Sequence, residues 1–133
     1  MKRERAETPF AIFTFVLTVP YFMGETYHYF AYVGFGQGIL NYLVDLIAIG
    51  LFWLASISSL RDRARSAAGW LAAAWGFAAC LNYRSFTWRY EAGQAGEVVA
   101  EPSGILVMLG ATLIISFIGL AMALYLSRPK KPV

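Results

Sequence analysis

Residues 103–126 read SGILVMLGATLIISFIGLAMALYL and contain no charged side chain. A helix rises about 1.5 Å per residue, so a run of this length crosses the roughly 30 Å of hydrocarbon in a bilayer. Hydrocarbon offers no water to the backbone, so a spanning segment must be a helix or a strand of a closed barrel. The run does not alternate apolar and polar residues as barrel strands do. It therefore predicts a transmembrane helix.

Three further apolar stretches occupy residues 8–32, 38–60 and 67–86. Hydrophobic residues make up 59% of the 133 residues and charged residues 14%, whereas soluble domains carry about 25% charged residues. A chain this short cannot bury so much apolar surface in its own core. We therefore expect a single all-α integral membrane domain, residues 1–133, folded as a four-transmembrane-helix bundle with an extracytoplasmic loop at residues 87–102. The first stretch is long and no small-x-small site follows it, so we expect an uncleaved helix rather than a signal peptide.

Lysine and arginine residues are divided unequally between the two sides of the predicted bundle. Nine of the 11 lie in the N-terminal tail, in the turn at residues 61–65 and in the C-terminal tail, whereas Arg84 and Arg89 lie on the other side. The positive-inside rule then places both termini in the cytoplasm, and we expect the inner (plasma) membrane of a bacterium. The net charge of +3 comes from these helix ends. We therefore expect lipid, and no nucleic acid, as a partner.

Each predicted helix carries one stripe of small or polar residues at three- and four-residue spacing. Small residues drive helix association in lipid because they let backbones approach closely. We expect three of the four tryptophans, Trp53, Trp70 and Trp75, to face lipid or a partner chain. The stripes predicted to face inward are Thr14, Thr18, Tyr21, Glu25 and His28; Asn41, Asp45, Ala48 and Ser56; Gly69, Ala72, Ala73, Gly76, Ala79 and Cys80; and Thr112, Ser116, Gly119 and Ala123.

Two acidic residues, Glu25 and Asp45, lie within predicted spans. Ionisable groups inside a bilayer are costly and usually functional. Each lies about 10 Å below the outer end of its helix at 1.5 Å per residue. The short turn between the two helices makes them antiparallel neighbours, so the carboxyl groups should meet at one depth. With His28, which shares a face with Glu25, they are the candidate catalytic residues; the candidate ligand-binding residues are Tyr21, Asn41, Asn82, Tyr83 and Arg84.

Several interpretations of this cluster compete. It fixes helix register without further function, it binds a ligand from the outside, or it is an acid–base site where one carboxyl group donates a proton while the other stays charged. Glu25-x-x-His28 has the spacing used by di-iron bundles, but those proteins need it twice. A mononuclear metal site of Glu25, His28 and Asp45 is a further alternative. The interpretation that we favour has no metal. The single Cys80 and the single histidine exclude multi-Cys and multi-His sites, and no nucleotide, zinc-protease or nucleophile-elbow motif indicates a cofactor.

The favoured functional hypothesis is a small polytopic membrane protein that binds a small or lipophilic ligand in a polar pocket in the outer half of the bundle. The first alternative is a membrane-embedded isomerase, cyclase or hydrolase that acts on a lipophilic substrate through Glu25 and Asp45. The second is an accessory subunit of a larger membrane complex or a homo-oligomeric transporter. A transporter needs a polar path through both halves, and the cytoplasmic halves of the predicted spans carry no charge.

Overall fold

The structure is a computed structural model that describes residues 2–33, 38–61, 68–97 and 104–128, apart from the side chains of residues 2–5 and 33. Within these ranges the chain forms α1 (Lys2–His28), a π-helical turn η1 (Tyr29–Val33), α2 (Ile39–Arg61), α3 (Ala68–Gln94) and α4 (Ile105–Ser127). The predicted all-α four-helix fold is confirmed. The predicted turns fall mostly at residues 34–37 and 62–67, which lie outside the described residues, as does the end of the predicted loop at 98–103.

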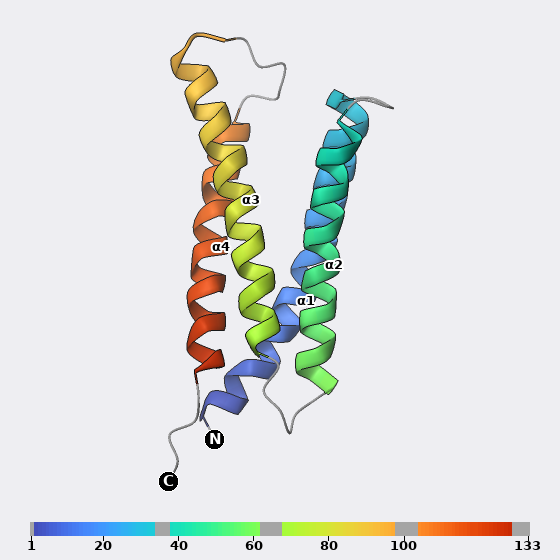
Figure 1. The fold of residues 1–133 in the computed structure, drawn as a ribbon, viewed down its shortest axis with the longest axis vertical. Coiled ribbons are helices and arrows are strands. Elements are labelled where there is room, and N and C mark those ends of the chain that lie inside the picture. Colours follow the sequence, from blue (N-terminus) through green and yellow to red (C-terminus); the bar gives the residue numbers. More distant parts are fainter. Residues whose placement is uncertain (1, 34–37, 62–67, 98–103, 129–133) are drawn as a thin grey trace.

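The helices form two antiparallel hairpins that lie side by side (Figure 1). α1 packs along α2, α3 packs along α4, and α2 contacts α3. In the described ranges α1 and α4 hardly contact each other, although the first and last helices of a closed bundle would be neighbours. The bundle is therefore open between α1 and α4. α1 begins and α4 ends at the lower end in Figure 1.

Among the described residues, three segments are long and apolar enough to cross a membrane: Ala6–Tyr32, Ile39–Arg61 and Ile105–Ser127. The helices α2 and α4 both run from the upper to the lower end of the molecule. When both cross the bilayer, the chain between them must cross back. The helix between them is α3, which is not one of these three segments but has 27 residues and, at about 40 Å, is long enough to make this return. The mean hydropathy of α3 is lower than that of α2 and α4. This fits a central position, because α3 packs against helices on two sides and uses small residues there.

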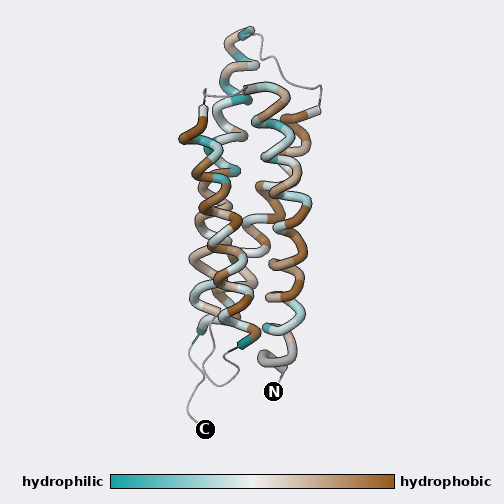
Figure 2. Tube along the Cα trace, turned by 90° about the vertical axis from the view of Figure 1, so that its right-hand side faces the viewer, coloured by the Kyte–Doolittle hydropathy of each residue, from teal (hydrophilic) through white to brown (hydrophobic). Residues whose placement is uncertain are grey.

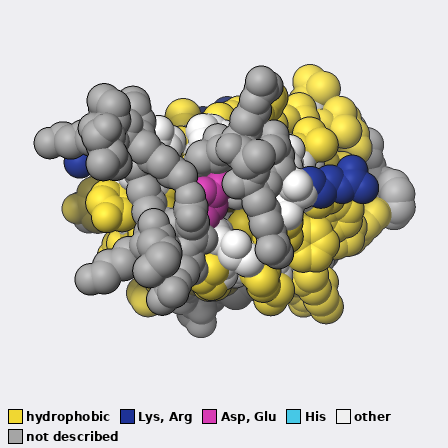
Figure 3. Space-filling view, turned by 90° about the horizontal axis from the view of Figure 1, so that it is seen from below, with side chains coloured by type: hydrophobic (Ala, Val, Ile, Leu, Met, Phe, Trp, Pro, Cys, Tyr) yellow, Lys and Arg dark blue, Asp and Glu magenta, His cyan; other side chains and the backbone are white. Residues whose placement is uncertain are grey.

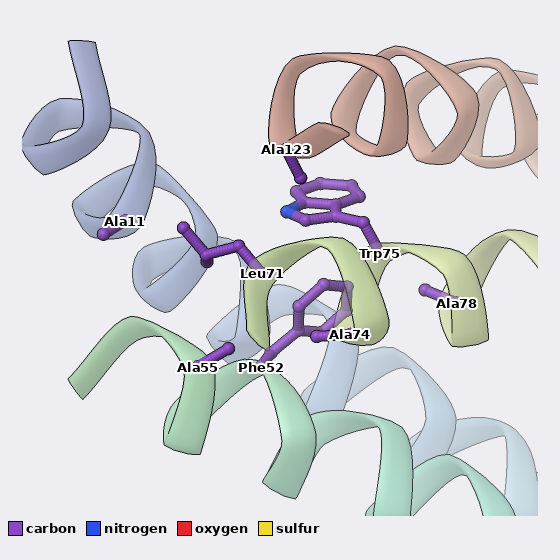
Figure 4. Close-up of a cluster of buried hydrophobic side chains, with 8 residues drawn as sticks. All are labelled: Ala11, Phe52, Ala55, Leu71, Ala74, Trp75, Ala78 and Ala123. Carbon is purple, nitrogen blue, oxygen red and sulfur yellow. The ribbon is translucent and has the colours of Figure 1, made fainter. Parts of the chain in front are cut away.

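The core lies in the lower half of the bundle and centres on Trp75, which is only 1% exposed. The indole Nε1 donates a hydrogen bond of 3.0 Å to Thr14 Oγ1 on α1. On the other side, a Cβ atom at Gly119 of α4 would lie 2.2 Å from the indole ring. The prediction that Trp75 faces lipid is wrong, because its ring fills the space that Gly119 leaves open. Figure 4 shows the surrounding cluster, Ala11, Phe52, Ala55, Leu71, Ala74, Trp75, Ala78 and Ala123.

The predicted inner faces of α1 and α4 are confirmed by the burial of Thr14, Thr18, Ser116 and Ala123. On α2, Ala48 and Ser56 are also buried, and Trp53 and Trp70 are exposed as predicted. The predicted stripe on α3 is partly wrong. Three of its members point outward, and the helix is turned so that Trp75 faces α1 and α4. The exposed members of that stripe are Gly69, Ala73 and Cys80, whereas the face buried instead includes Ala68, Leu71 and Ala78.

The upper ends of α1 and α2 in Figure 1 are held together by aromatic contacts. The ring of Tyr29 stacks on that of Tyr42 with centroids 4.6 Å apart. The Tyr42 hydroxyl shares a hydrogen bond of 2.9 Å with Thr26 Oγ1. These contacts fix the register of the two helices and bring Glu25 to the level of Asp45.

Candidate functional site

The two acidic residues of the membrane spans meet between α1 and α2. The Tyr21 hydroxyl on α1 lies within hydrogen-bonding reach of the Asp45 carboxyl group on α2. Glu25 lies one helical turn beyond Tyr21 and is close enough to Asp45 for the two charges to repel each other. All three side chains are half-buried. The structure thus brings together the two predicted carboxyl groups and a phenol that can donate a hydrogen bond to one of them.

Two arginines of α3 face this acidic pair. Arg84 Nη2 lies 3.4 Å from the Asn41 side-chain oxygen on α2, at the long end of hydrogen-bonding distance. Arg84 and Arg89 both act electrostatically on Asp45, and Arg89 also acts on Glu25. Groups of both signs from three helices therefore converge in the upper half of the molecule as drawn in Figure 1.

Arg89 is the member of this cluster that sequence reasoning missed. The expected third span ends at residue 86, but α3 continues to Gln94 and carries Arg89 on a rigid helix. Residues 84–92 contain neither glycine nor proline, and this absence is the signal that predicts a continued helix. The predicted loop accordingly begins later than the apolar pattern indicates.

The other predicted site residues divide into two groups. His28 is close enough to act electrostatically on Asp45, and its ring lies 5.6 Å from that of Tyr32. Asn82 points to the opposite side of α3, where its Nδ2 donates a hydrogen bond of 2.9 Å to Ser116 Oγ on α4. Tyr83 is 55% exposed on the outer surface of α3. The structure therefore joins His28 to the cluster but directs Asn82 to the α3–α4 contact and Tyr83 outward.

Polar residues are concentrated in the upper half and at the helix ends, whereas the lower half between them is mostly apolar (Figure 2). The lower half nevertheless contains buried hydroxyl groups at Thr14, Thr18 and Ser56. At the lower end, Ser59 donates a hydrogen bond of 2.7 Å to the Glu7 carboxylate, and Figure 3 shows acidic side-chain atoms near the middle of this end. Thr14, Thr18 and Ser59 thus take part in hydrogen bonds between helices, whereas Ser56 Oγ has no partner among the described residues. The charged groups that lie well inside the spans, Glu25 and Asp45, are in the upper half.

In the described part of the chain, which includes Glu25, His28 and Asp45, no group of three His, Cys, Asp or Glu residues is arranged to hold a metal ion. No family model matches the chain, and neither a curated protein nor a solved structure matches it. Function therefore has to be argued from the cluster itself. Its carboxyl groups and phenol can exchange protons or accept hydrogen bonds, and its guanidinium groups can bind an anionic or carbonyl oxygen.

Proposed function

We propose that this protein binds a small amphiphilic molecule in the outer half of the bundle. The polar part of the molecule would be held by Tyr21, Glu25, Asp45, Arg84 and Arg89, and its apolar part would lie in the bilayer. The observation that carries the proposal is the convergence of acidic and basic side chains from three helices at one level. Charged groups within a membrane are expensive to keep, so their presence favours a functional site.

The distribution of packing contacts supports a ligand site over a purely structural cluster. The register of α1 and α2 is already fixed above by the Tyr29–Tyr42 stack, and the core around Trp75 joins α1, α3 and α4 below. Neither contact depends on Glu25 or Asp45. The bundle therefore has apolar and aromatic contacts that hold it together without the charged groups.

One observation favours an acid–base enzyme as the second candidate. The Tyr21 hydroxyl is within hydrogen-bonding reach of Asp45, and Glu25 lies near the same carboxyl group. A proton could pass from one carboxyl group to a bound lipophilic substrate while the other carboxyl group accepts one from it. This isomerase-type chemistry uses the same residues as the ligand site, so the two candidates differ only in whether the bound molecule changes.

For the cellular setting, we propose the bacterial inner membrane with both termini in the cytoplasm, on the basis of the distribution of basic residues. An accessory subunit or a homo-oligomeric transporter would use the exposed tryptophans Trp53 and Trp70 for contacts with another chain. The mass of the purified protein in detergent distinguishes these arrangements from a monomer.

The proposed site is tested by identifying the lipophilic molecules that copurify with the protein. Wild type and Asp45→Asn are purified in a mild detergent, extracted with organic solvent and compared by mass spectrometry. Glu91→Gln is the matched control, because Glu91 is an exposed carboxylate on α3 at the same end of the bundle. We expect one molecule near stoichiometric amount in wild type and control that is depleted at least tenfold in Asp45→Asn. Identical extracts from all three proteins would contradict the proposal.

The same material separates binding from catalysis. The recovered molecule is incubated with wild-type protein and with Asp45→Asn in the same detergent. A product that forms only with wild type identifies an enzyme, whereas recovery of the unchanged molecule from both supports a binding protein.

A further inference from the structure

The contact between α2 and α3 is packed in its lower half and open in its upper half. The buried residues of α2 lie between Ala48 and Ser59, and residues 39–47, all of which the structure describes, include none. On α3, residues 80–91 likewise include no buried residue. In Figure 1 the two helices are closest near their lower ends and separate toward the upper end. The polar side chains of the upper half are therefore not packed together as core residues are.

The charged groups of this open region are sorted by helix. The acidic pair, Glu25 and Asp45, belongs to α1 and α2, whereas Arg84 and Arg89 belong to α3. Arg84 Nη2 approaches the side chain of Asn41, which is one helical turn from Asp45 on α2. The guanidinium therefore lies within about one turn of the acidic pair along the helix axis. A molecule held between α2 and α3 meets a negative side and a positive side at nearly the same level.

Groups on both sides have hydrogen-bonding capacity that the described residues leave unused. The 3.4 Å contact with Asn41 is the one hydrogen bond that the Arg84 side chain makes with a described residue, although a guanidinium carries several N–H donors. No described side chain donates a hydrogen bond to Glu25, which is half-buried. A purely anionic headgroup would suit Arg84 but would be repelled by the acidic pair, and a purely cationic headgroup would meet the reverse. A headgroup that carries both charges fits both sides.

We propose that the ligand of this site is a zwitterionic lipid whose headgroup joins a primary ammonium to a phosphate. The ammonium is bound by Glu25 and Asp45, and it donates hydrogen bonds to their carboxyl groups, which a quaternary ammonium cannot do. The phosphate is bound by Arg84, because a planar guanidinium matches phosphate oxygens with paired hydrogen bonds. The acyl chains lie in the surrounding bilayer. This inference rests on the proposed function, since it names the headgroup of the molecule that the site holds.

Phospholipids that share the same acyl chains and differ in headgroup test this assignment. Native mass spectrometry of protein freed of bound lipid measures its affinity for phosphatidylethanolamine, phosphatidylcholine and phosphatidylglycerol. We expect phosphatidylethanolamine to bind at least about tenfold more tightly than the other two, because a hydrogen bond to a charged group is worth about that factor in affinity. Equal affinities, or a preference for phosphatidylglycerol or phosphatidylcholine, would overturn the proposal.

Two variants assign the two ends of the headgroup. Asp45→Asn should remove most of the preference for phosphatidylethanolamine over phosphatidylcholine, whereas Arg84→Gln should weaken both lipids by about tenfold and keep their ratio, because both carry a phosphate. The matched controls are Glu91→Gln and Arg61→Gln, which change exposed charges outside the cluster, and they should bind as wild type does. The ratio is measured on folded protein in one sample, so partial unfolding does not alter it. An unchanged ratio in Asp45→Asn would overturn the proposal.

Failure of this inference is distinguishable from failure of the proposed function. If the three phospholipids bind alike while another molecule copurifies with wild type and is depleted in Asp45→Asn, the assigned headgroup is wrong and the proposed ligand site stands. If the extracts of wild type and Asp45→Asn are identical, the ligand site itself is contradicted.

Discussion

The contact between Trp75 and Gly119 leads to a sharp prediction about packing. A methyl group added at Gly119 would lie 2.2 to 2.5 Å from three atoms of the indole ring, which is far inside van der Waals contact. The ring cannot move aside freely, because its Nε1 is bonded to Thr14 and Phe52 packs against it with centroids 5.0 Å apart. Gly119→Ala should therefore displace Trp75 and destabilise the contact between α3 and α4.

The magnitude follows from three contributions. Overpacking a well-filled core costs about 1–3 kcal/mol. Rotation of the indole away from Thr14 loses a hydrogen bond worth about 1 kcal/mol. Alanine is favoured over glycine in a helix by about 0.5–1 kcal/mol, which offsets part of the cost. The net expectation is a loss of about 1–3 kcal/mol in the free energy of unfolding.

The control is Gly76→Ala on α3, where an added Cβ would lie 3.7 Å from Leu120 Cδ1, an ordinary contact. This change should be neutral or slightly stabilising. Thermal and denaturant unfolding in one detergent compares the two variants with wild type. A double-mutant cycle with Trp75→Leu should show a coupling above about 1 kcal/mol, because removal of the ring removes the clash. If Gly119→Ala is as stable as Gly76→Ala, the assigned packing of Trp75 against α4 is wrong.

Three further outcomes are expected. A reporter that is active only outside the cytoplasm should be inactive when fused after Val133 and active when inserted at Gly96, and the reverse pattern would contradict the proposed orientation. Ser56→Ala should leave the free energy of unfolding unchanged or raise it by up to about 1 kcal/mol, because Ser56 Oγ is buried and has no hydrogen-bond partner in the described chain; a clear loss of stability would show that the hydroxyl is bonded. Thr14→Val keeps nearly the same shape but should cost about 1–3 kcal/mol, since it leaves the indole Nε1 of Trp75 buried and unbonded; thermal unfolding at or above the wild-type temperature would exclude that bond.

Local patterns in the sequence were sufficient to predict the helices and the meeting of Glu25 with Asp45. Apolar run length predicts a span, and a short connection places two successive helices side by side at equal depth. The inward stripe on α1 also follows from spacing alone, because Thr14, Thr18 and Tyr21 recur at intervals of four and three residues.

Features that depend on contacts between distant helices could not be predicted in this way. A tryptophan in a membrane helix usually faces lipid, and Trp75 turns inward because of a glycine 44 residues later on α4. The position of Asn82 in the sequence suits the polar cluster equally well, but its partner Ser116 is on α4. The role of Arg89 required the continuation of α3 beyond its apolar part, which hydropathy does not report. The open side of the bundle between α1 and α4 also depends on how the helices pair, and no pattern within one helix encodes that.

One measurement tests most directly whether the polar cluster serves function rather than folding. It is the stability of Asp45→Asn and Glu25→Gln in protein freed of bound lipophilic molecules. Bound ligand must be removed first, because a molecule that binds the native state raises the melting temperature by itself. For a working site, both variants should melt at or above the wild-type temperature, since functional sites retain groups that folding does not need, and both should fail to retain the molecule that copurifies with wild type. A lower melting temperature together with undiminished binding would contradict the proposed site and would show that the cluster stabilises the bundle by pairing with Arg84 and Arg89.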